Sequence, residues 1–186
     1  MSDRRTLLTD ASVIVRLSSV GELPLLRAID GDVVVPRAVE SEVIDNPGAV
    51  QLSAGVDNRW ITVTDELPVE AVLRAADHLE VDSVQPLEVE SEDRPAIEGD
   101  TALLAHALSD RQTAVVVSDD KPLRETCKAL SISVTGSIGI LVRAVEVGEI
   151  DQETAVDRLY AMDEVGERLS ASLIRRGERL IEDAST

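Results

Sequence analysis

Hydrophobic residues follow two different spacings along this chain. Short apolar runs bounded by polar residues are typical of buried strands, whereas apolar residues three or four positions apart are typical of helices with one buried face. The short runs predict strands at residues 5–9, 32–35, 60–65, 113–118 and 132–135. The helical spacing predicts helices at residues 10–21, 22–29, 36–44, 49–56, 68–79, 96–109, 121–130 and 136–148. Strands and helices therefore alternate along most of the chain.

This alternation predicts a three-layer α/β/α fold with a central, mostly parallel sheet, because a helix that joins two parallel strands crosses over the sheet with a right-handed turn. The pattern weakens at residues 80–95, an acidic stretch that we interpret as a loop rather than a domain boundary. From Asp151 onward the sequence is charged and helical. We expect residues 1–150 to form the α/β domain and residues 151–186 to form a C-terminal helical extension.

The charge of the chain is strongly negative, with 36 acidic and 18 basic residues and a formal net charge of −18. Among the basic residues only Lys121 and Lys128 are lysines. This composition resembles that of proteins from halophilic archaea, which work in concentrated salt. An acidic protein is ordinarily a poor partner for nucleic acid, but adaptation to salt weakens that exclusion. The early charges and the lack of a long apolar run predict a soluble cytoplasmic protein with no membrane partner.

Carboxylates directly follow two of the predicted strands. Asp10 comes after the strand at residues 5–9, and Asp119 and Asp120 come after the strand at residues 113–118. In an open parallel sheet, ligands bind at the carboxyl ends of the strands, near the point where the strand order reverses. We therefore expect these acids at one edge of the sheet, with ordinary surface charge as the alternative for any single one of them.

Two further acids fall on apolar helix faces. Asp100 lies in the middle of the apolar stripe of the helix at residues 96–109, and Glu42, rather than Glu40, lies beside apolar residues of the helix at residues 36–44. A carboxylate on such a face is costly unless it is paired, hydrogen-bonded or bound to a metal. The alternatives are that Asp100 interacts only with free backbone N–H groups at the helix start and that Glu42 is a boundary charge.

Acids gathered in this way repel one another and raise one another's pKa values unless a divalent cation supplies positive charge. Carboxylate and water oxygens are the ligands preferred by Mg²⁺ and Mn²⁺. The single cysteine, Cys127, cannot form a multi-cysteine site, and His78 and His106 are poorly placed for catalysis. The pattern therefore predicts a Mg²⁺ or Mn²⁺ site made of carboxylates.

Four segments resemble, in order, the motifs of the PIN domain family, the ribonuclease fold of VapC-type toxins and of related archaeal proteins. The segment TDASVIVRL resembles the first motif, in which Asp10 is the first metal-binding acid and Ser12 is a small polar neighbour. The segment VVVPRAVESEV resembles the second motif, which places an acid, Glu42, six residues after Pro36.

The other two motifs come later in the chain. EGDTALLAHAL resembles the third motif, with Asp100 where many members carry glutamate. VVVSDDKPLR resembles the fourth motif, and aligning Ser118 with the threonine that usually begins it makes Asp120 the equivalent acid and Asp119 its neighbour.

The resemblance implies a metal-dependent endoribonuclease in which metal-activated water hydrolyses an RNA phosphodiester bond. The implied catalytic acids are Asp10, Glu42, Asp100 and Asp120. The implied metal-binding residues are these four and Asp119. The residues implied to orient ligands or water are Ser12, Ser118 and Asp119.

The resemblance also implies partners and leaves alternatives open. RNA is the implied substrate, a toxin would have an antitoxin protein as its partner, and PIN domains often form homodimers. The alternative function is a PIN-like module that binds RNA or protein with little or no catalysis, which the additional C-terminal helices favour. A receiver domain also collects acids at strand ends, but it requires an acid pair after its first strand, where this chain has only Asp10.

Overall fold

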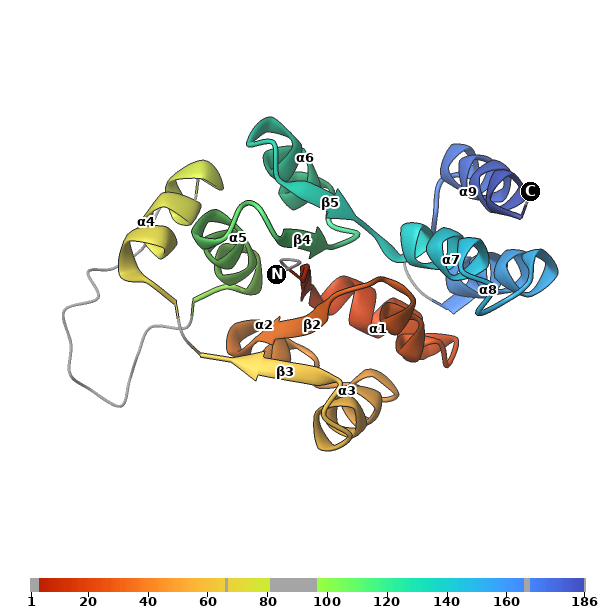
Figure 1. The fold of residues 1–186 in the computed structure, drawn as a ribbon, viewed down its shortest axis with the longest axis horizontal. Helices are drawn as coiled ribbons and strands as arrows, with labels where there is room; N and C mark the ends of the chain where they lie inside the picture. Colours follow the sequence, from red (N-terminus) through yellow and green to blue (C-terminus); the bar gives the residue numbers. More distant parts are fainter. Residues whose placement is uncertain (1–3, 66, 81–96, 166–167, 186) are drawn as a thin grey trace.

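A five-stranded sheet forms the centre of the molecule (Figure 1). The computed structural model describes residues 4–65, 67–80, 97–165 and 168–185, so the predicted loop lies outside the described residues except for Glu80. The strands are β1 (Thr6–Thr9), β2 (Asp32–Pro36), β3 (Ile61–Thr64), β4 (Ala114–Val117) and β5 (Ser133–Thr135). Their order across the sheet is β3-β2-β1-β4-β5, and every pairing within the described ranges is parallel.

Helices flank this sheet, which confirms the predicted three-layer α/β/α fold. They are α1 (Ala11–Ser19), η1 (Leu23–Ala28), α2 (Arg37–Glu42), α3 (Gly48–Asp57), α4 (Val69–His78), α5 (Gly99–Ser109), α6 (Lys121–Ala129), α7 (Ser137–Glu146), α8 (Gln152–Val165) and α9 (Ala171–Ala184). None of these helices is both long and apolar enough to cross a membrane. The segment predicted as a helix at residues 22–29 is instead the short 3₁₀ helix η1, where Pro24 removes a backbone donor near the start.

The strand order explains why both faces of the sheet are covered. From β1 the chain moves outward through β2 to β3, then returns past β1 and continues through β4 to β5 in the opposite direction. Because each parallel crossover is right-handed, the connecting helices of the two halves pack on opposite faces. Accordingly, α1 packs with α3, whereas α5 packs with α4 and α6.

Helix α5 is more deeply buried than its sequence pattern predicted. The predicted apolar stripe is buried at Leu103, Leu104, Ala107 and Leu108, but Ala102 and Ala105 are buried as well. This helix packs against β1, β2, β4 and α4, so little of its circumference meets solvent. The enclosing layers therefore hold the start of α5 close to the edge of the sheet.

The strand order reverses between β1 and β4, and the carboxyl ends of these two neighbouring strands lie side by side. In the β1–β4 register Thr9 is opposite Val117. The next residue continues the pairing, since the Asp10 backbone N–H donates to the Val117 carbonyl oxygen at 2.9 Å. A parallel sheet offers its ligand crevice at this kind of position.

The C-terminal helices share the core of the α/β domain. Leu159 and Met162 of α8 and Ile181 of α9 are fully buried and belong to one apolar cluster with Leu141 of α7. Gly177 lets α9 approach α8, because a Cβ at this position would lie 2.9 Å from Leu159 Cδ2. The division of the chain at residue 150 therefore stays a prediction, and the shared core gives it a direct test.

We predict that Leu159→Ala destabilises the whole described fold rather than the C-terminal helices alone. The lost packing should lower the free energy of unfolding by about 2–5 kcal/mol. Urea unfolding should be followed by far-UV circular dichroism and by the fluorescence of Trp60, the single tryptophan, which precedes β3 at one edge of the sheet. Both signals should shift together to lower urea.

The matched control for this variant is Val165→Ala on the same helix, because Val165 is 63% exposed. Its effect should stay within about 0.5 kcal/mol. A Trp60 transition that does not move in Leu159→Ala would show that residues 151–186 unfold as a separate domain.

Candidate functional site

Asp10 occupies the end of β1 and is held by two serines. Its side chain is nearly buried, at 5% exposure, although it stands at the N-cap position of α1 and makes no capping bond there. Instead, Oδ2 accepts hydrogen bonds from Ser12 Oγ at 2.6 Å and from Ser118 Oγ at 2.7 Å. Oδ1 has no hydrogen-bond partner among the described residues. The serines therefore fix the carboxylate and leave one oxygen free for a ligand.

Asp120 occupies the end of β4, beside Asp10. Its Oδ2 accepts from the Leu123 backbone N–H at 2.8 Å and caps α6, while its own N–H donates to Ser118 Oγ at 3.0 Å. Ser118 is fully buried, and its hydroxyl links Asp10, which follows β1, to Asp120, which lies beyond β4. These bonds fix the position of Asp120 and leave its Oδ1 available to bind a ligand.

Asp119 turns away from this pair toward the start of α7. Its Oδ1 accepts from the Ser137 N–H at 2.9 Å, and its Oδ2 accepts from Ser137 Oγ at 2.7 Å. Arg16 Nε lies 3.3 Å from the same Oδ2, with both side chains less than one-fifth exposed. Both oxygens of Asp119 thus have partners within the protein, and the metal-binding role of this residue stays a prediction.

Glu42 reaches the site from the end of α2. Its Oε1 accepts a hydrogen bond from the Gly99 N–H at 2.8 Å, at the first residue of α5. A Cβ at Gly99 would lie 2.8 Å from both oxygens of Glu42, so a glycine permits this close approach. Glu42 is solvent-exposed rather than inward-facing as its helix position suggested, and Glu40 pairs with Arg37 at 2.6 Å.

Asp100 lies in the first turn of α5, next to Gly99, and is close enough to the other acids to feel their charges. Burial, followed by the negative charges of Asp10, Asp120, Glu42 and Glu98, raises the pKa of Asp100 to about 7. The negative charges of three acids from distant parts of the chain therefore act on Asp100 at this edge of the sheet. Burial is the larger cause, as expected for a carboxyl group at the start of an enclosed helix.

The four acids are not paired with cations in the described part of the chain. Within the described ranges, Asp10, Glu42, Asp100 and Asp120 form no salt bridge. Lys121, which follows Asp120, pairs with Glu125 on the exposed face of α6. A set of oxygen donors with mutual repulsion and no internal cation suits a hard divalent ion such as Mg²⁺.

The side chains of the four acids nevertheless do not converge on a single point. Among the described residues, no group of three Asp, Glu, His or Cys side chains has the spacing required to hold one metal ion. His78 is exposed at the end of α4, and burial lowers the pKa of His106 on α5. Metal binding by the four acids would therefore require their free oxygens to move closer together.

Two residues of this site, Ser137 and Arg16, had no role predicted from the sequence. Ser137, Arg16 and Arg124 surround Asp119 and the neighbouring backbone, where Arg124 Nη1 donates to the Ser118 carbonyl oxygen at 2.6 Å. A Cβ at Gly136 would lie 2.5 Å from Asp119 Oδ1, so glycine is needed beside this contact. The segment TGSIG was a visible signal for a tight helix start, but no local pattern connected it with Asp119.

Comparison with known proteins places the chain in a family. A family model described as PIN domain matches residues 6–183, which includes all five strands and nearly all of α9. A search of the curated proteins gave no match. Since the matched segment is almost the whole chain and includes Asp100 and the three distant acids whose charges act on it, the protein belongs to the PIN domain family.

Proposed function

We propose that this protein is a divalent-metal-dependent endoribonuclease that hydrolyses RNA phosphodiester bonds. PIN domains are generally nucleases that use a divalent metal such as Mg²⁺ or Mn²⁺. The observation that carries the proposal is the environment of Asp100, which is half-buried among four other carboxylates that form no salt bridge in the described part of the chain. In the proposed reaction, this unbalanced negative charge would hold the divalent metal.

The residues that would hold the metal are Asp10, Glu42, Asp100 and Asp120. A bound Mg²⁺ or Mn²⁺ supplies positive charge at the phosphate and favours deprotonation of water at neutral pH. Ser12 and Ser118 orient the Asp10 carboxylate through Oδ2, so that Oδ1 can face the ligand. Asp119 keeps the β4–α6 connection in place through Ser137 and Arg16.

Asp100 has a second role that follows from its pKa. Near neutral pH its carboxyl group is close to half protonated when no cation is present. It would give up that proton when a cation binds, because positive charge stabilises the carboxylate. Metal affinity at the site should therefore rise with pH through the neutral range.

A second candidate is a PIN-like module that binds RNA or protein with little or no hydrolysis. The observations that favour it are the full engagement of Asp119 and the lack of three converged metal-binding side chains among the described residues. A toxin role, with an antitoxin partner and a homodimeric assembly, is a finer version of the nuclease proposal. Growth arrest on expression, relieved by a co-expressed partner, would support it.

We predict that the purified protein cleaves single-stranded RNA in high salt with Mn²⁺ and that Asp10→Asn and Asp100→Asn each lower the rate at least about 100-fold. Each substitution removes a charged oxygen ligand while it keeps the shape of the side chain. A gel assay with end-labelled RNA measures the rate, and chelation of the metal should stop cleavage. Asp77→Asn on the exposed face of α4 is the control and should cleave as the wild type does.

Equal cleavage by the wild type and both site variants would sink the nuclease proposal, since the activity would then come from a contaminant. Metal binding without cleavage, measured by calorimetry, would instead favour the binding module.

We predict that Asp100→Asn stabilises the metal-free protein by more at pH 8 than at pH 5. The folded-state pKa of Asp100, about 7, lies above its ordinary value of 3.8. Folding therefore favours the protonated form, and this contribution is complete below the ordinary value and is lost as the pH rises through 7. Because Asp100 is only half-buried, the gain at pH 8 should be about 1 kcal/mol, or about 2–4 °C in Tm.

Differential scanning fluorimetry at the two pH values measures this effect, with Asp77→Asn as the matched control. Mn²⁺ at pH 8 should raise the Tm of the wild type more than that of Asp100→Asn. A gain that is the same at pH 5 and pH 8 would mean that Asp100 does not titrate in this range.

A further inference from the structure

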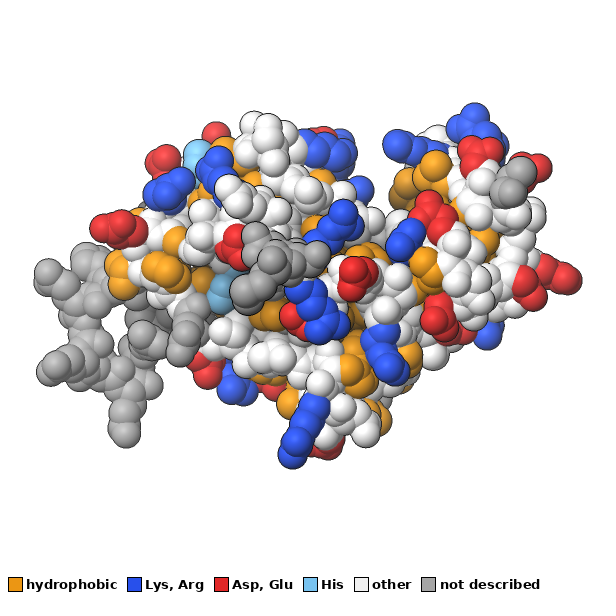
Figure 2. Space-filling view, in the orientation of Figure 1, with side chains coloured by type: hydrophobic (Ala, Val, Ile, Leu, Met, Phe, Trp, Pro, Cys, Tyr) orange, Lys and Arg blue, Asp and Glu red, His pale blue; other side chains and the backbone are white. Residues whose placement is uncertain are grey.

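A groove with basic walls runs beside the carboxylate site, between α6 and β5 on one side and α9 on the other, with the start of α7 between them. Its volume is about 520 Å³. Figure 2 shows the surface hollowed between these parts, with Lys and Arg side chains on both sides. The charged residues that line this basic groove are Arg16, Asp119, Arg124, Lys128, Arg168 and Arg176.

The groove concentrates positive charge in a protein that has little of it. The chain has twice as many acidic as basic residues, yet among the described residues five cations and one acid line this groove. The acid is Asp119, which is already paired with Arg16 and Ser137. Within the described ranges, Lys128, Arg168 and Arg176 form no salt bridge. The groove therefore carries uncompensated charge that suits an anionic ligand.

The basic groove and the carboxylate site share a wall. Arg124 lines the groove and donates to the Ser118 carbonyl oxygen, while Ser118 Oγ bonds to Asp10. Asp119 faces the groove, and the adjacent Asp120 belongs to the carboxylate site. A polymer with a phosphate at the carboxylate site could therefore place its neighbouring phosphates against the cations of the groove.

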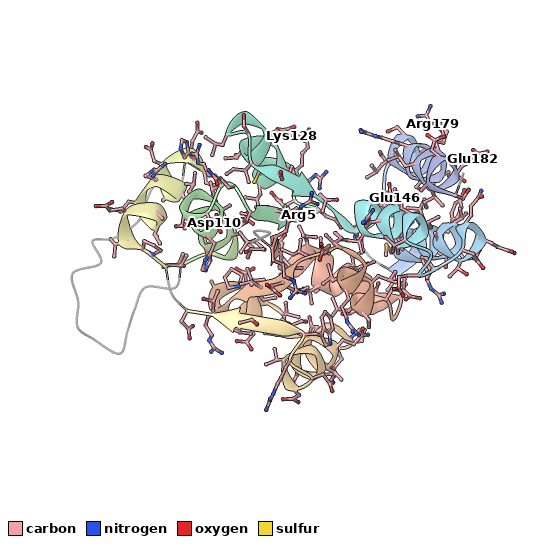
Figure 3. All side chains as sticks on the ribbon, viewed as in Figure 1. Arg5, Asp110, Lys128, Glu146, Arg179 and Glu182 are labelled. Carbon is pink, nitrogen blue, oxygen red and sulfur yellow. The ribbon has the colours of Figure 1, made fainter. Side chains whose placement is uncertain are left out.

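Helix α9 gives this groove a mixed apolar and basic rim. Leu173 and Leu180 are 39% and 40% exposed, and they line the groove together with Arg176. Residues three and four positions apart share a helix face, so a guanidinium lies between two apolar patches. In Figure 3, Lys128 lies on α6 and the labelled Arg179 on α9, the two helices that border the groove. Such a surface fits a polymer with alternating charged and less polar parts.

We propose that the basic groove binds the phosphodiester backbone of single-stranded RNA that extends from the carboxylate site. The identity of the polymer rests on the proposed function, but binding in the groove requires neither metal nor cleavage. Contacts between cations and phosphates carry no base information, so binding should depend strongly on salt and weakly on sequence. The overall negative charge is screened over about 10 Å at 0.1 M salt, which leaves direct contacts in the groove dominant.

The test is the binding of a fluorescein-labelled oligouridylate, about 12 nucleotides long, which is within the range bound by single-strand-binding folds. Fluorescence anisotropy should be recorded with EDTA at several KCl concentrations. Lys128→Ala and Arg176→Ala should each weaken binding about threefold to tenfold. The double variant should reduce the slope of log affinity against log salt by about 1.4, because each lost contact with a single strand changes it by about 0.7.

Arg175→Ala is the matched control, because Arg175 is an exposed neighbour on α9 that does not line the groove. Its affinity should stay within about twofold of the wild type, since it removes the same charge without a phosphate contact. Arg176→Lys should keep most of the affinity. Far-UV circular dichroism should be unchanged in all of these exposed-site variants.

Three outcomes would overturn the proposal. The first is a double variant with the affinity and salt slope of the wild type, and the second is no binding of the oligonucleotide by the wild type at low salt. The third is tighter binding of a polyglutamate peptide than of the oligonucleotide, with loss in the double variant, which would assign the groove to an acidic protein segment. RNA binding that is lost in the double variant while the wild type cleaves nothing would support the groove and refute the nuclease proposal.

Discussion

The parallel pairing of β1 with β4 is the constraint on which the rest of this molecule depends. Strand order reverses between these neighbours, so the residues that follow them leave the sheet side by side. The Asp10 N–H bond to Val117 and the buried hydroxyl of Ser118 join the two chain segments at the edge. Without that pairing, Asp10 and Asp120 would be unrelated surface acids. With it, they lie at a fixed position in front of the buried helix α5.

Helix α5 then sets the electrostatic character of the edge. Its burial against the sheet and α4 places Asp100 in a poorly solvated position close to four other carboxylates. That arrangement costs free energy in the absence of a cation, because neither burial nor like charges favour the ionised form. The protein offsets part of this cost through local hydrogen bonds at Asp10, Glu42 and Asp120. Positive charge from a bound cation would remove much of this cost.

The same fold separates negative from positive charge over a short distance. Asp119 follows β4 as Asp120 does, yet it turns toward Ser137 and Arg16 and so becomes part of the wall of the basic groove. The C-terminal helices complete that groove and also share the central apolar core. A cluster of carboxylates and a groove with basic walls thus lie side by side in a chain with a net charge of −18.

Local pattern alone determined the alternation of strands and helices, the acids at the ends of β1 and β4, and the unusual place of Asp100 on an apolar helix. These follow from periodicity, which depends on near neighbours in the chain. Tertiary structure alone decided that Glu42 rests on Gly99, that Asp119 binds Ser137, and that Arg176 and Lys128 border one groove. Such contacts join residues distant in sequence, and they depend on how the layers pack and how closely glycine lets two backbones approach. No local spacing encodes that geometry.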